Sequence, residues 1–308
     1  MTYMPHRYMK SNWKPYAALV ALCFLWGTTY LAIKIGVEDG FPPFLFSGLR
    51  FVISGLLIIA GGKLAGWEIF PAKTEFKRIL VSGLFIFTGG NLFLVLAEQS
   101  VSSGLAALVN AAFPLWIVII TRIWNPTEKT PLITFIGILV GFVGQWMIFY
   151  DHLIEIGQQV NYFGLILLVW GLANGAFGSI HMKKYPVNLN PAITGAWQML
   201  LSGLVTTFIG LYEGEWSSLP TQMSGWWSMI YLIVAGSILG YSLFVYALRY
   251  LPAQQVSVYA YVNPIVAVFL GWLLLKENIS PMAIYAMFVT MIGVYLVNRG
   301  MSAARKSS

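Results

Sequence analysis

Ten long apolar stretches fill nearly the whole of this 308-residue chain. A hydrocarbon core roughly 30 Å thick takes about 20 helical residues to cross, so each stretch predicts a transmembrane helix. Strands of a closed membrane barrel would instead show short segments of alternating hydrophobicity. With 58% hydrophobic and 9% charged residues, the chain has no room for a sizeable soluble domain. The predicted spans are Tyr16–Gly36, Pro43–Gly62, Ile79–Glu98, Ser103–Ile123, Pro131–Tyr150, Tyr162–Met182, Pro191–Tyr212, Trp226–Leu248, Ala253–Leu275 and Pro281–Asn298. We therefore expect an all-α polytopic membrane protein.

The basic residues lie almost entirely in alternate loops. Of the 18 Lys and Arg residues, 15 lie at the two chain ends or in the even-numbered loops between spans. Acidic residues such as Glu38, Asp151 and Glu213 lie in the other loops. Because cytoplasmic loops are enriched in Lys and Arg, both termini are predicted to be cytoplasmic. The net charge of +7 thus reflects topology, and no nucleic-acid partner is predicted.

The second half of the chain repeats the first in outline. A shift of 150 residues pairs Pro114 with Pro264, and a shift of 144 pairs Trp26-Gly27 with Trp170-Gly171. The segments are predicted to be a tail over 1–12, repeats over 13–150 and 160–298, and a second tail over 299–308. Two copies of an odd number of helices enter the membrane from opposite sides, which is the inverted-repeat plan of secondary transporters. We expect two inverted five-helix repeats around a central cavity.

Pro114 and Pro264 fall at the centres of the fourth and ninth spans. An interior proline removes a backbone hydrogen bond and kinks the helix. One interpretation is a symmetric pair of hinges beside the cavity, since freed carbonyls are tolerated at membrane depth only against protein or water. The alternative is a pair of static kinks needed for packing.

Three charged residues within predicted spans are candidates for function. Arg50 is seven residues past Pro43, roughly 10 Å from the end of its helix. Its guanidinium suits a carboxylate or phosphate of a solute, and the alternative is a structural ion pair. Lys34 and Glu98 lie near the ends of the first and third spans. Together they predict a charge gate or a protonatable site, and the alternative is a solvated position at the membrane interface.

Polar and aromatic residues recur on the faces of several predicted helices. Such stripes face the interior of a bundle because lipid offers no hydrogen-bonding partners. Several stripes together predict a wet cavity with aromatic walls that stack on an organic solute or attract a cation. Hydrogen bonding between helices is the alternative for each stripe. The candidates for solute binding are Arg50, Trp26, Tyr30, Asn91, Trp170, Asn174, Gln198, Tyr259 and Asn263.

The fifth span carries glycines instead of a polar stripe. Gly137, Gly141 and Gly144 form a GxxxG-like face, which favours close contact between helices. This span is therefore predicted to be a packing helix or, through Gly137 and Gly141, the interface of a homodimer.

Several short motifs, found in both halves of the chain, together resemble the pattern of one protein family. They are Trp26-Gly27-Thr28-Thr29-Tyr30, Ile35-Gly36-Val37, Pro42-Pro43, Arg50-Phe51, Gly90-Asn91, Ala97-Glu98, Ser103-Gly104-Leu105-Ala106-Ala107 before Pro114, and Tyr259-Ala260-Tyr261-Val262-Asn263-Pro264. The pattern resembles the EamA-domain proteins of the drug/metabolite transporter superfamily, over almost the whole chain.

The resemblance implies ten helices in two inverted repeats, with the fifth and tenth helices outside a central cavity. It also implies a bacterial inner-membrane permease that exports amino acids, related metabolites or toxic compounds. This chain departs from internal symmetry, because Gln198 stands opposite Arg50 and Leu248 opposite Glu98. A charged site is therefore expected mainly in the first half.

The predicted function is a secondary transporter that moves a small organic solute across the bilayer by alternating access. A channel or facilitator is the first alternative, although no ring of charges or repeated filter motif is present in the sequence. A membrane-embedded enzyme is the second, and the sequence contains no HExxH helix and no P-loop. Cys23 is the single cysteine, so no disulfide or thiol pair is predicted. No enzymatic activity, cofactor or metal is predicted.

Overall fold

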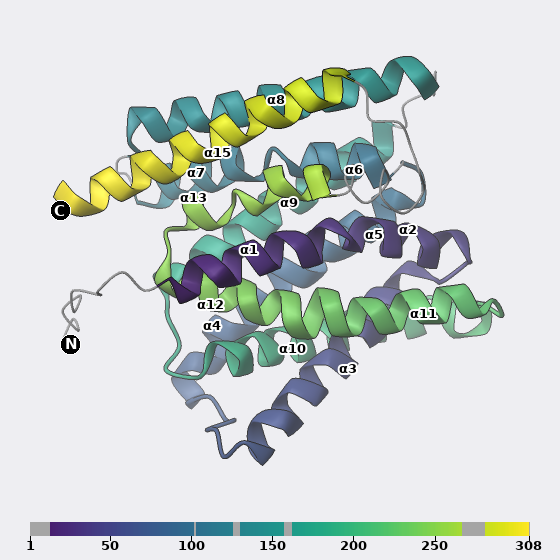
Figure 1. Ribbon diagram of the computed structural model, residues 1–308. Coiled ribbons are helices and arrows are strands. Elements are labelled where there is room, and N and C mark those ends of the chain that lie inside the picture. The colour runs from purple at the N-terminus through teal and green to yellow at the C-terminus, as the bar shows by residue number, and fades with distance from the viewer. Residues whose placement is uncertain (1–12, 102, 126–129, 157–161, 267–280, 308) are drawn as a thin grey trace.

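The computed structural model describes residues 13–101, 103–125, 130–156, 162–266 and 281–307, and every regular element in these ranges is helical (Figure 1). The elements up to residue 156 are α1 (Lys14–Gly27), α2 (Thr29–Glu38), α3 (Pro43–Leu64), α4 (Lys73–Gly83), η1 (Leu84–Asn91), α5 (Leu92–Glu98), α6 (Ser103–Asn110), α7 (Phe113–Trp124) and α8 (Leu132–Ile156). Those that follow are α9 (Tyr162–Lys184), α10 (Pro191–Tyr212), η2 (Glu215–Ser218), α11 (Met223–Tyr231), η3 (Leu232–Tyr241), α12 (Ser242–Tyr250), α13 (Ala253–Val256) and α15 (Pro281–Ser307). The all-α prediction is confirmed for the described residues.

Seven helical stretches among the described residues are long and apolar enough to cross a membrane. They are Lys14–Glu38, Pro43–Leu64, Lys73–Glu98, Tyr162–Lys184, Pro191–Tyr212, Met223–Tyr250 and Ile284–Ala303. Phe113–Trp124 and Leu132–Met147 are shorter apolar helices at the fourth and fifth predicted spans. The ninth predicted span, Ala253–Leu275, lies partly outside the described residues. The polytopic helical fold is thus confirmed, and the count of ten stays a prediction.

The structure describes one of the two segments that were predicted to be tails. Residues 1–12 lie outside the described residues. At the other end α15 continues without interruption to Ser307, so the segment 299–308, expected as a tail, is helical as far as the structure describes it.

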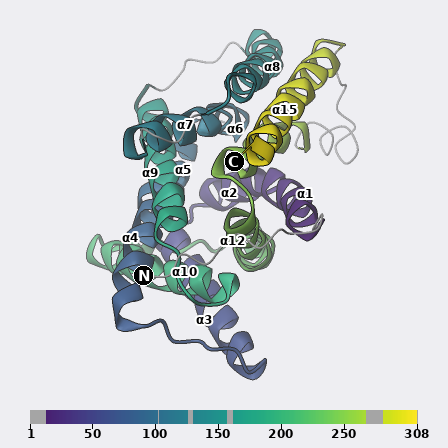
Figure 2. The same cartoon turned by 90° about the vertical axis from the view of Figure 1, so that its left-hand side faces the viewer.

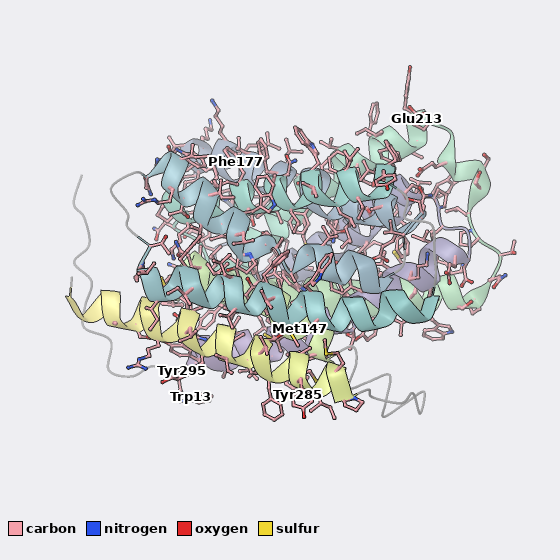
Figure 3. All side chains as sticks on the ribbon, turned by 90° about the horizontal axis from the view of Figure 1, so that it is seen from above. Trp13, Met147, Phe177, Glu213, Tyr285 and Tyr295 are labelled. Atoms are coloured by element: carbon pink, nitrogen blue, oxygen red, sulfur yellow. The ribbon has the colours of Figure 1, made fainter. Side chains whose placement is uncertain are left out.

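The outer surface of the bundle is apolar, and polar side chains are found inside it. Tyr285 and Tyr295 on α15 project outward with exposed fractions of 66% and 60% (Figure 3). Ser54, Thr206 and Gln198 are buried within the bundle. An apolar exterior around a polar interior is what a hydrocarbon solvent requires, because lipid cannot satisfy a polar group.

Two pairs of helices, one from each half of the chain, pack closely through glycine. In the pair of α8 and α15, the two backbones approach so closely at Gly293 that a side chain there would not fit. A Cβ atom added to Gly293 would lie 2.4 Å from the Gly141 nitrogen and 2.7 Å from the Gly137 oxygen. In the pair of α3 and α10, a Cβ on Gly203 would lie 2.9 Å from the Gly48 oxygen. The pairs lie on opposite sides of the molecule, with the other long helices between them (Figures 1 and 2).

This packing agrees with the first of the two roles predicted for the glycines of the fifth span, that of a packing helix. Gly137 faces Gly293 and its neighbours on α15 of the same chain, Gly141 faces Tyr261, and Gly144 faces Thr290. The glycine face is therefore covered within the chain. The homodimer predicted through Gly137 and Gly141 stays an untested prediction.

The helix around Pro114 is broken instead of kinked. α6 ends at Asn110, Ala111 and Ala112 form a turn, and Pro114 lies in the first turn of α7. Because proline has no N–H to donate to the carbonyl four residues back, the helix restarts at this position. Pro264 instead lies within a helical stretch, residues 259–266, that begins after a turn at 257–258. The expected symmetry of the two positions is corrected accordingly, and their role as hinges stays a prediction.

Candidate functional site

Two π-helical stretches, η1 and η3, occur at corresponding places in the two halves. They begin at Leu84 and Leu232 and end at Asn91 and Tyr241, so their ends lie 148 and 150 residues apart. A π-helical turn is wider than an α-helical turn, and π-helical segments occur frequently at functional sites. The Gly236 carbonyl in η3 accepts a hydrogen bond of 2.9 Å from the Trp26 indole nitrogen. The backbone of η3 thus takes part in side-chain contacts.

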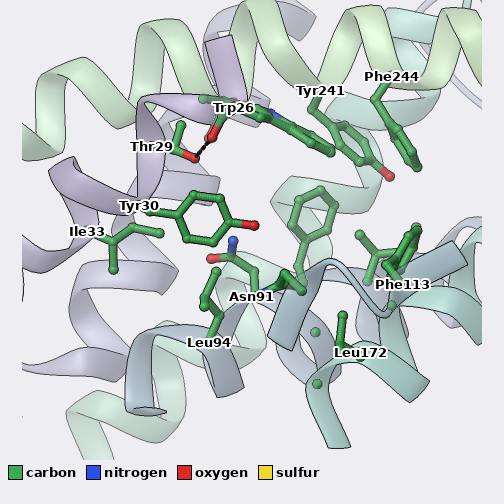
Figure 4. Close-up of a pocket in the computed structure, with 18 of the residues that line it drawn as sticks. Trp26, Thr29, Tyr30, Ile33, Asn91, Leu94, Phe113, Leu172, Tyr241 and Phe244 are labelled. Carbon is green, nitrogen blue, oxygen red and sulfur yellow. Dashed lines mark hydrogen bonds between the residues drawn. The ribbon is translucent and has the colours of Figure 1, made fainter. Parts of the chain in front are cut away.

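A cavity in the middle of the bundle is bounded by both π-helical stretches (Figure 4). Its empty volume is about 910 Å³, part of it open to solvent. The wall residues from the first half are Trp26, Thr29, Tyr30, Ile33, Arg50, Phe51, Ile86, Phe87, Gly90, Asn91, Leu94, Asn110 and Phe113. Those from the second half are Leu168, Gly171, Leu172, Gly175, Ser179, Gly236, Ser237, Tyr241, Phe244, Tyr259 and Asn263. No residue of α8 or α15 is among them, as expected for the fifth and tenth helices.

Aromatic rings form one continuous wall of the cavity. The Trp26 ring lies 5.2 Å from Phe244 and 4.8 Å from Tyr259, measured between ring centroids, and it meets Tyr259 edge to face. Phe87 extends the wall by contacting Tyr241 at 4.7 Å. Such ring pairs hold one another in fixed orientations. The wall therefore presents rigid apolar and π-rich surface to a solute.

Arg50 is the charged side chain in the cavity wall. It is 4% exposed, and its Nε donates a 2.9 Å hydrogen bond to the Ser237 hydroxyl on η3. Its guanidinium carbon lies 4.9 Å from the centre of the Phe51 ring. The Nη1 atom has no hydrogen-bond partner, and Arg50 forms no ion pair with any acidic residue that the structure describes. The guanidinium is thus oriented by Ser237 and retains an unused donor.

Three further polar side chains line the cavity near Arg50. Asn263 interacts with the Tyr30 hydroxyl. With its amide nitrogen toward α1, Asn263 donates to the carbonyl oxygens of Tyr259 and Cys23 at 2.8 and 3.1 Å. The Asn91 side-chain oxygen is buried and has no partner among the described residues. Tyr30 and Asn91 point into the same space (Figure 4). Asn91 therefore offers a free acceptor.

The remaining predicted solute-binding residues do not line this cavity. Trp170 on α9 has an exposed fraction of 60% and lies on the outer surface. The Asn174 amide donates to the Trp170 carbonyl at 2.8 Å. Gln198 is fully buried, donates to Ser82 at 2.6 Å and accepts from the Tyr241 hydroxyl at 2.8 Å. Gln198 thus reaches the cavity only through Tyr241.

Lys34 and Glu98 lie together beyond one end of the cavity, which we call the Lys34 end and define by Lys34, Glu98 and Val101. The Lys34 ammonium donates to the backbone carbonyls of Glu98 and Val101 at 2.9 and 3.3 Å. It also lies 3.5 Å from a carboxylate oxygen of Glu38. The Glu98 carboxyl group is fully buried, and neither of its oxygens has a hydrogen-bond partner among the described residues. The lysine thus contacts the backbone of Glu98.

Sequence reasoning missed the part of the cavity wall that η3 contributes. Ser237 and Tyr241 lie in a continuous apolar run, where neighbouring hydrophobic residues hide any polar face. The repeat itself contained a usable signal, because a shift of 150 residues places Gly240-Tyr241 on Gly90-Asn91. Applying that shift to Asn91 would have identified Tyr241.

Comparisons with known proteins agree with this fold. The EamA-like transporter family matches residues 13–150 and again 162–299. An Escherichia coli (strain K12) protein named uncharacterized inner membrane transporter YedA is 33% identical, over 92% of this chain and 90% of that protein. The uncharacterized transporter YoaV of Bacillus subtilis is 24% identical over 90% of this chain and 94% of its own. A solved crystal structure shares the fold, with a TM-score of 0.75, 18% identity and coverage of 96% and 99% of the two chains. The chain belongs to the EamA-like transporter family.

Proposed function

We propose that this protein is a secondary transporter that exports small organic metabolites, such as amino acids, related compounds or drugs, across the bacterial inner membrane by alternating access. Family membership, the name of the Escherichia coli relative and a cavity lined by both halves support the proposal. It includes ten helices in two inverted repeats with both termini in the cytoplasm. The twofold family match and the alternation of basic loops support that topology.

The observation that carries the proposal is the unpaired guanidinium of Arg50 in the cavity wall. A buried cation without a counter-ion is strongly unfavourable, so such residues mark functional sites in membrane proteins. Arg50 has no acidic partner among the described residues, and its Nη1 atom is unused. A carboxylate or phosphate on the solute supplies the missing charge, and the planar guanidinium can hold either through two parallel hydrogen bonds.

Other groups in the same cavity wall favour a solute that also carries an amine. The free oxygen of Asn91 accepts a hydrogen bond, and it lies in the same cavity wall as the aromatic surface of Trp26 and Tyr259. Aromatic faces attract a cation through their quadrupoles. A zwitterion with its carboxylate on Arg50 and its ammonium near Asn91 uses both sites, which is the chemistry of an amino acid.

Alternating access requires parts of the bundle to move around this fixed site. The turn at Ala111 and Ala112 divides α6 from α7 directly before Pro114, and a second turn precedes the stretch that contains Pro264. Phe113 and Asn263, each adjacent to one of these prolines, line the cavity. We propose that movement at the two proline-containing helices opens the cavity to one side of the membrane at a time.

Counterflow in proteoliposomes tests the proposal. Vesicles are preloaded with pooled amino acids, nucleosides and organic cations, and uptake of each labelled compound is followed. We expect saturable exchange of one class, a loss of about 100-fold in Arg50→Ala, and partial activity in Arg50→Lys. Arg122→Ala is the matched control, because Arg122 is an exposed arginine on α7.

Two results would contradict the assignment. Unsaturable flux without exchange would indicate a channel or facilitator instead of a carrier. Full exchange kinetics in a folded Arg50→Ala variant would remove Arg50 from the binding site while leaving the carrier itself in place.

A further inference from the structure

A lysine caps the end of a cavity-lining helix in each half of the molecule. Lys34 on α2 donates to the carbonyls of Glu98 and Val101 at the end of α5. Lys183 on α9 donates to the carbonyls of Leu248 and Leu251, at 3.0 and 2.7 Å, at the end of α12. A cation at the last carbonyls of a helix satisfies acceptors that have no partner within the helix. We call the second group, Lys183, Leu248 and Leu251, the Lys183 end.

The two ends differ in one side chain. Lys183 lies 149 residues after Lys34, and Leu248 lies 150 residues after Glu98, so they occupy corresponding places in the repeat. Both Glu98 and Leu248 are buried. The carboxyl group of Glu98 therefore occupies a site that the other half fills with a hydrocarbon side chain.

Apart from Lys34, the surroundings of Glu98 do not provide for a negative charge. The adjacent residues Ala97 and Val101 belong to an apolar cluster with Ala106 and Leu168. Among the described residues, the titratable groups that interact with Glu98 are Tyr30 and Lys34, both on α2.

The elements packed around α5 supply no compensating charge either. α6 and η1 contain no titratable residue. Arg50 on α3 bonds to Ser237 instead, and Tyr162 on α9 is largely exposed. A buried carboxylate that accepts no hydrogen bond is strongly unfavourable, and taking up a proton removes the charge.

We propose that Glu98 is a proton-binding site that controls access to the cavity at the Lys34 end. While this end is closed and Glu98 is buried, Glu98 carries a proton. When the end opens, water reaches the carboxyl group, the proton passes to that water, and the resulting carboxylate pairs with the Lys34 ammonium. Closing takes one proton back from the same aqueous side, so the step itself moves no net proton across the membrane.

This assignment rests on the proposed function and adds a regulation to it. Acid on the side that the Lys34 end faces holds this end closed, and alkali favours its opening. The opening equilibrium changes about tenfold per pH unit wherever one proton is released on opening. Leu248 does not titrate, so the Lys183 end has no equivalent control. The pH on the side of the membrane that the Lys183 end faces therefore does not change the opening of that end through Leu248.

Cysteine labelling measures the opening without any solute. Leu94 lines the cavity one helical turn before Glu98 (Figure 4), so Leu94→Cys in a Cys23→Ser background reports on the Lys34 end. A membrane-impermeant maleimide is applied in turn to spheroplasts and to inverted vesicles. The side that labels the cysteine is the side whose pH is then varied. We expect the labelling rate to fall about tenfold per pH unit on acidification, relative to the same reporter carrying Glu98→Gln.

Control variants separate this proposal from the transport function. Leu248→Gln places an equal amide at the Lys183 end and is expected to keep the pH dependence. If the reporter has the same pH dependence with and without Glu98→Gln, the proposal is wrong, whatever the counterflow result. Absent counterflow with intact pH-dependent labelling would instead contradict only the carrier assignment.

Infrared spectroscopy gives an independent reading of the proton and does not depend on a variant that transports. The difference spectrum between the wild type and Glu98→Gln should contain the C=O stretch of one protonated carboxylic acid at neutral pH. A carboxylate band in its place would overturn the proposal.

Discussion

The Lys34 end and the Lys183 end are built alike and differ in chemistry. At each end a lysine donates to two backbone carbonyls at or just beyond the end of a helix, with distances from 2.7 to 3.3 Å. At the Lys34 end the capped helix carries the buried Glu98 side chain, and at the Lys183 end it carries Leu248. The lysine cap depends on backbone positions, which the repeat conserves. The response to pH depends on one side chain, and this side chain differs between the two repeats.

The cavity wall likewise combines a backbone that is alike in the two halves with side chains that differ. The π-helical stretches η1 and η3 occur in both halves and both contribute wall residues. The charged group of the wall, Arg50, has Gln198 at the corresponding place in the second half, 148 residues further on. Gln198 bonds to Ser82 and Tyr241 instead of lining the cavity. The duplicated chain thus gives a symmetric scaffold with a binding site that is charged on one side.

The largest expected effect comes from exchanging the two side chains that distinguish the ends. In the double variant Glu98→Leu, Leu248→Glu, the buried carboxyl group lies beside Lys183. Control by pH should then move to the opposite face of the membrane and retain its slope of about tenfold per pH unit. Ser179→Cys, one turn before Lys183 on the cavity wall, reports on that end by maleimide labelling.

The single variants are the controls for this exchange. Glu98→Leu alone should leave neither end dependent on pH, and Leu248→Glu alone should leave both ends dependent on pH. If the double variant responds to pH on the original face, a group other than Glu98 controls the Lys34 end.

The next largest effect concerns the lysine caps. Lys34→Met and Lys183→Met each remove two charge-assisted hydrogen bonds to backbone carbonyls, so each should cost about 1.5–3 kcal/mol of stability. The two losses should agree within about 1 kcal/mol, because the additional pair of Lys34 with the exposed Glu38 is worth only about 0.3–0.5 kcal/mol. Thermal unfolding in detergent, followed by tryptophan fluorescence, measures both.

Lys63→Met is the matched control for the caps, since Lys63 is an exposed lysine in the last turn of α3. Its melting temperature should equal that of the wild type. If only one of the two caps proved stabilising, the two ends would not be structurally equivalent.

Much of the fold and part of the site could be predicted from the sequence. The helical spans follow from the long apolar stretches, because crossing a bilayer requires them. Arg50 was identified because an arginine deep within a span is costly unless it is used, and it does line the cavity. Trp26 and Tyr259 also lie in the wall, as expected from their aromatic and polar faces. Their contact with a solute stays a prediction.

The position of Trp170 shows where the sequence argument failed. A shift of 144 residues paired Trp170 with Trp26, whereas the two family matches begin 149 residues apart and pair Trp26 with Gly175. Five residues rotate a position by about 140° around a helix, which is the difference between the cavity and the outer surface. Gly175 does line the cavity, and Trp170 does not. The π-helical stretches were equally hidden, since an apolar run has no periodicity that distinguishes a wider turn.

A smaller effect is expected at Gln198, and it sharpens the contrast with Arg50. Gln198→Ala removes one donor to the Ser82 hydroxyl and the acceptor of the Tyr241 hydroxyl, and it should cost about 1–3 kcal/mol of stability. The solute concentration that gives half-maximal exchange should change less than about threefold, since Gln198 does not line the cavity. Tyr241→Phe, which removes only the hydroxyl, should be non-additive with Gln198→Ala in a double-mutant cycle. A loss of solute affinity as large as that of Arg50→Ala would place Gln198 in the binding site.

The smallest effect is expected at the hydrogen bond between Arg50, in the first half of the chain, and Ser237, in the second half. Ser237 accepts the hydrogen bond of Arg50 Nε at 2.9 Å, so Ser237→Ala leaves the guanidinium in place but less well oriented. Losing one such bond costs about 0.5–1.5 kcal/mol, which corresponds to a rise of about 2- to 10-fold in the half-maximal concentration, with the maximal exchange rate unchanged. Ser47→Ala is the matched control, because the Ser47 hydroxyl is buried one turn before Arg50 and has no hydrogen-bond partner among the described residues. If Ser237→Ala abolished exchange as Arg50→Ala does, Ser237 would itself bind the solute, and the second half would contribute directly to the anion site.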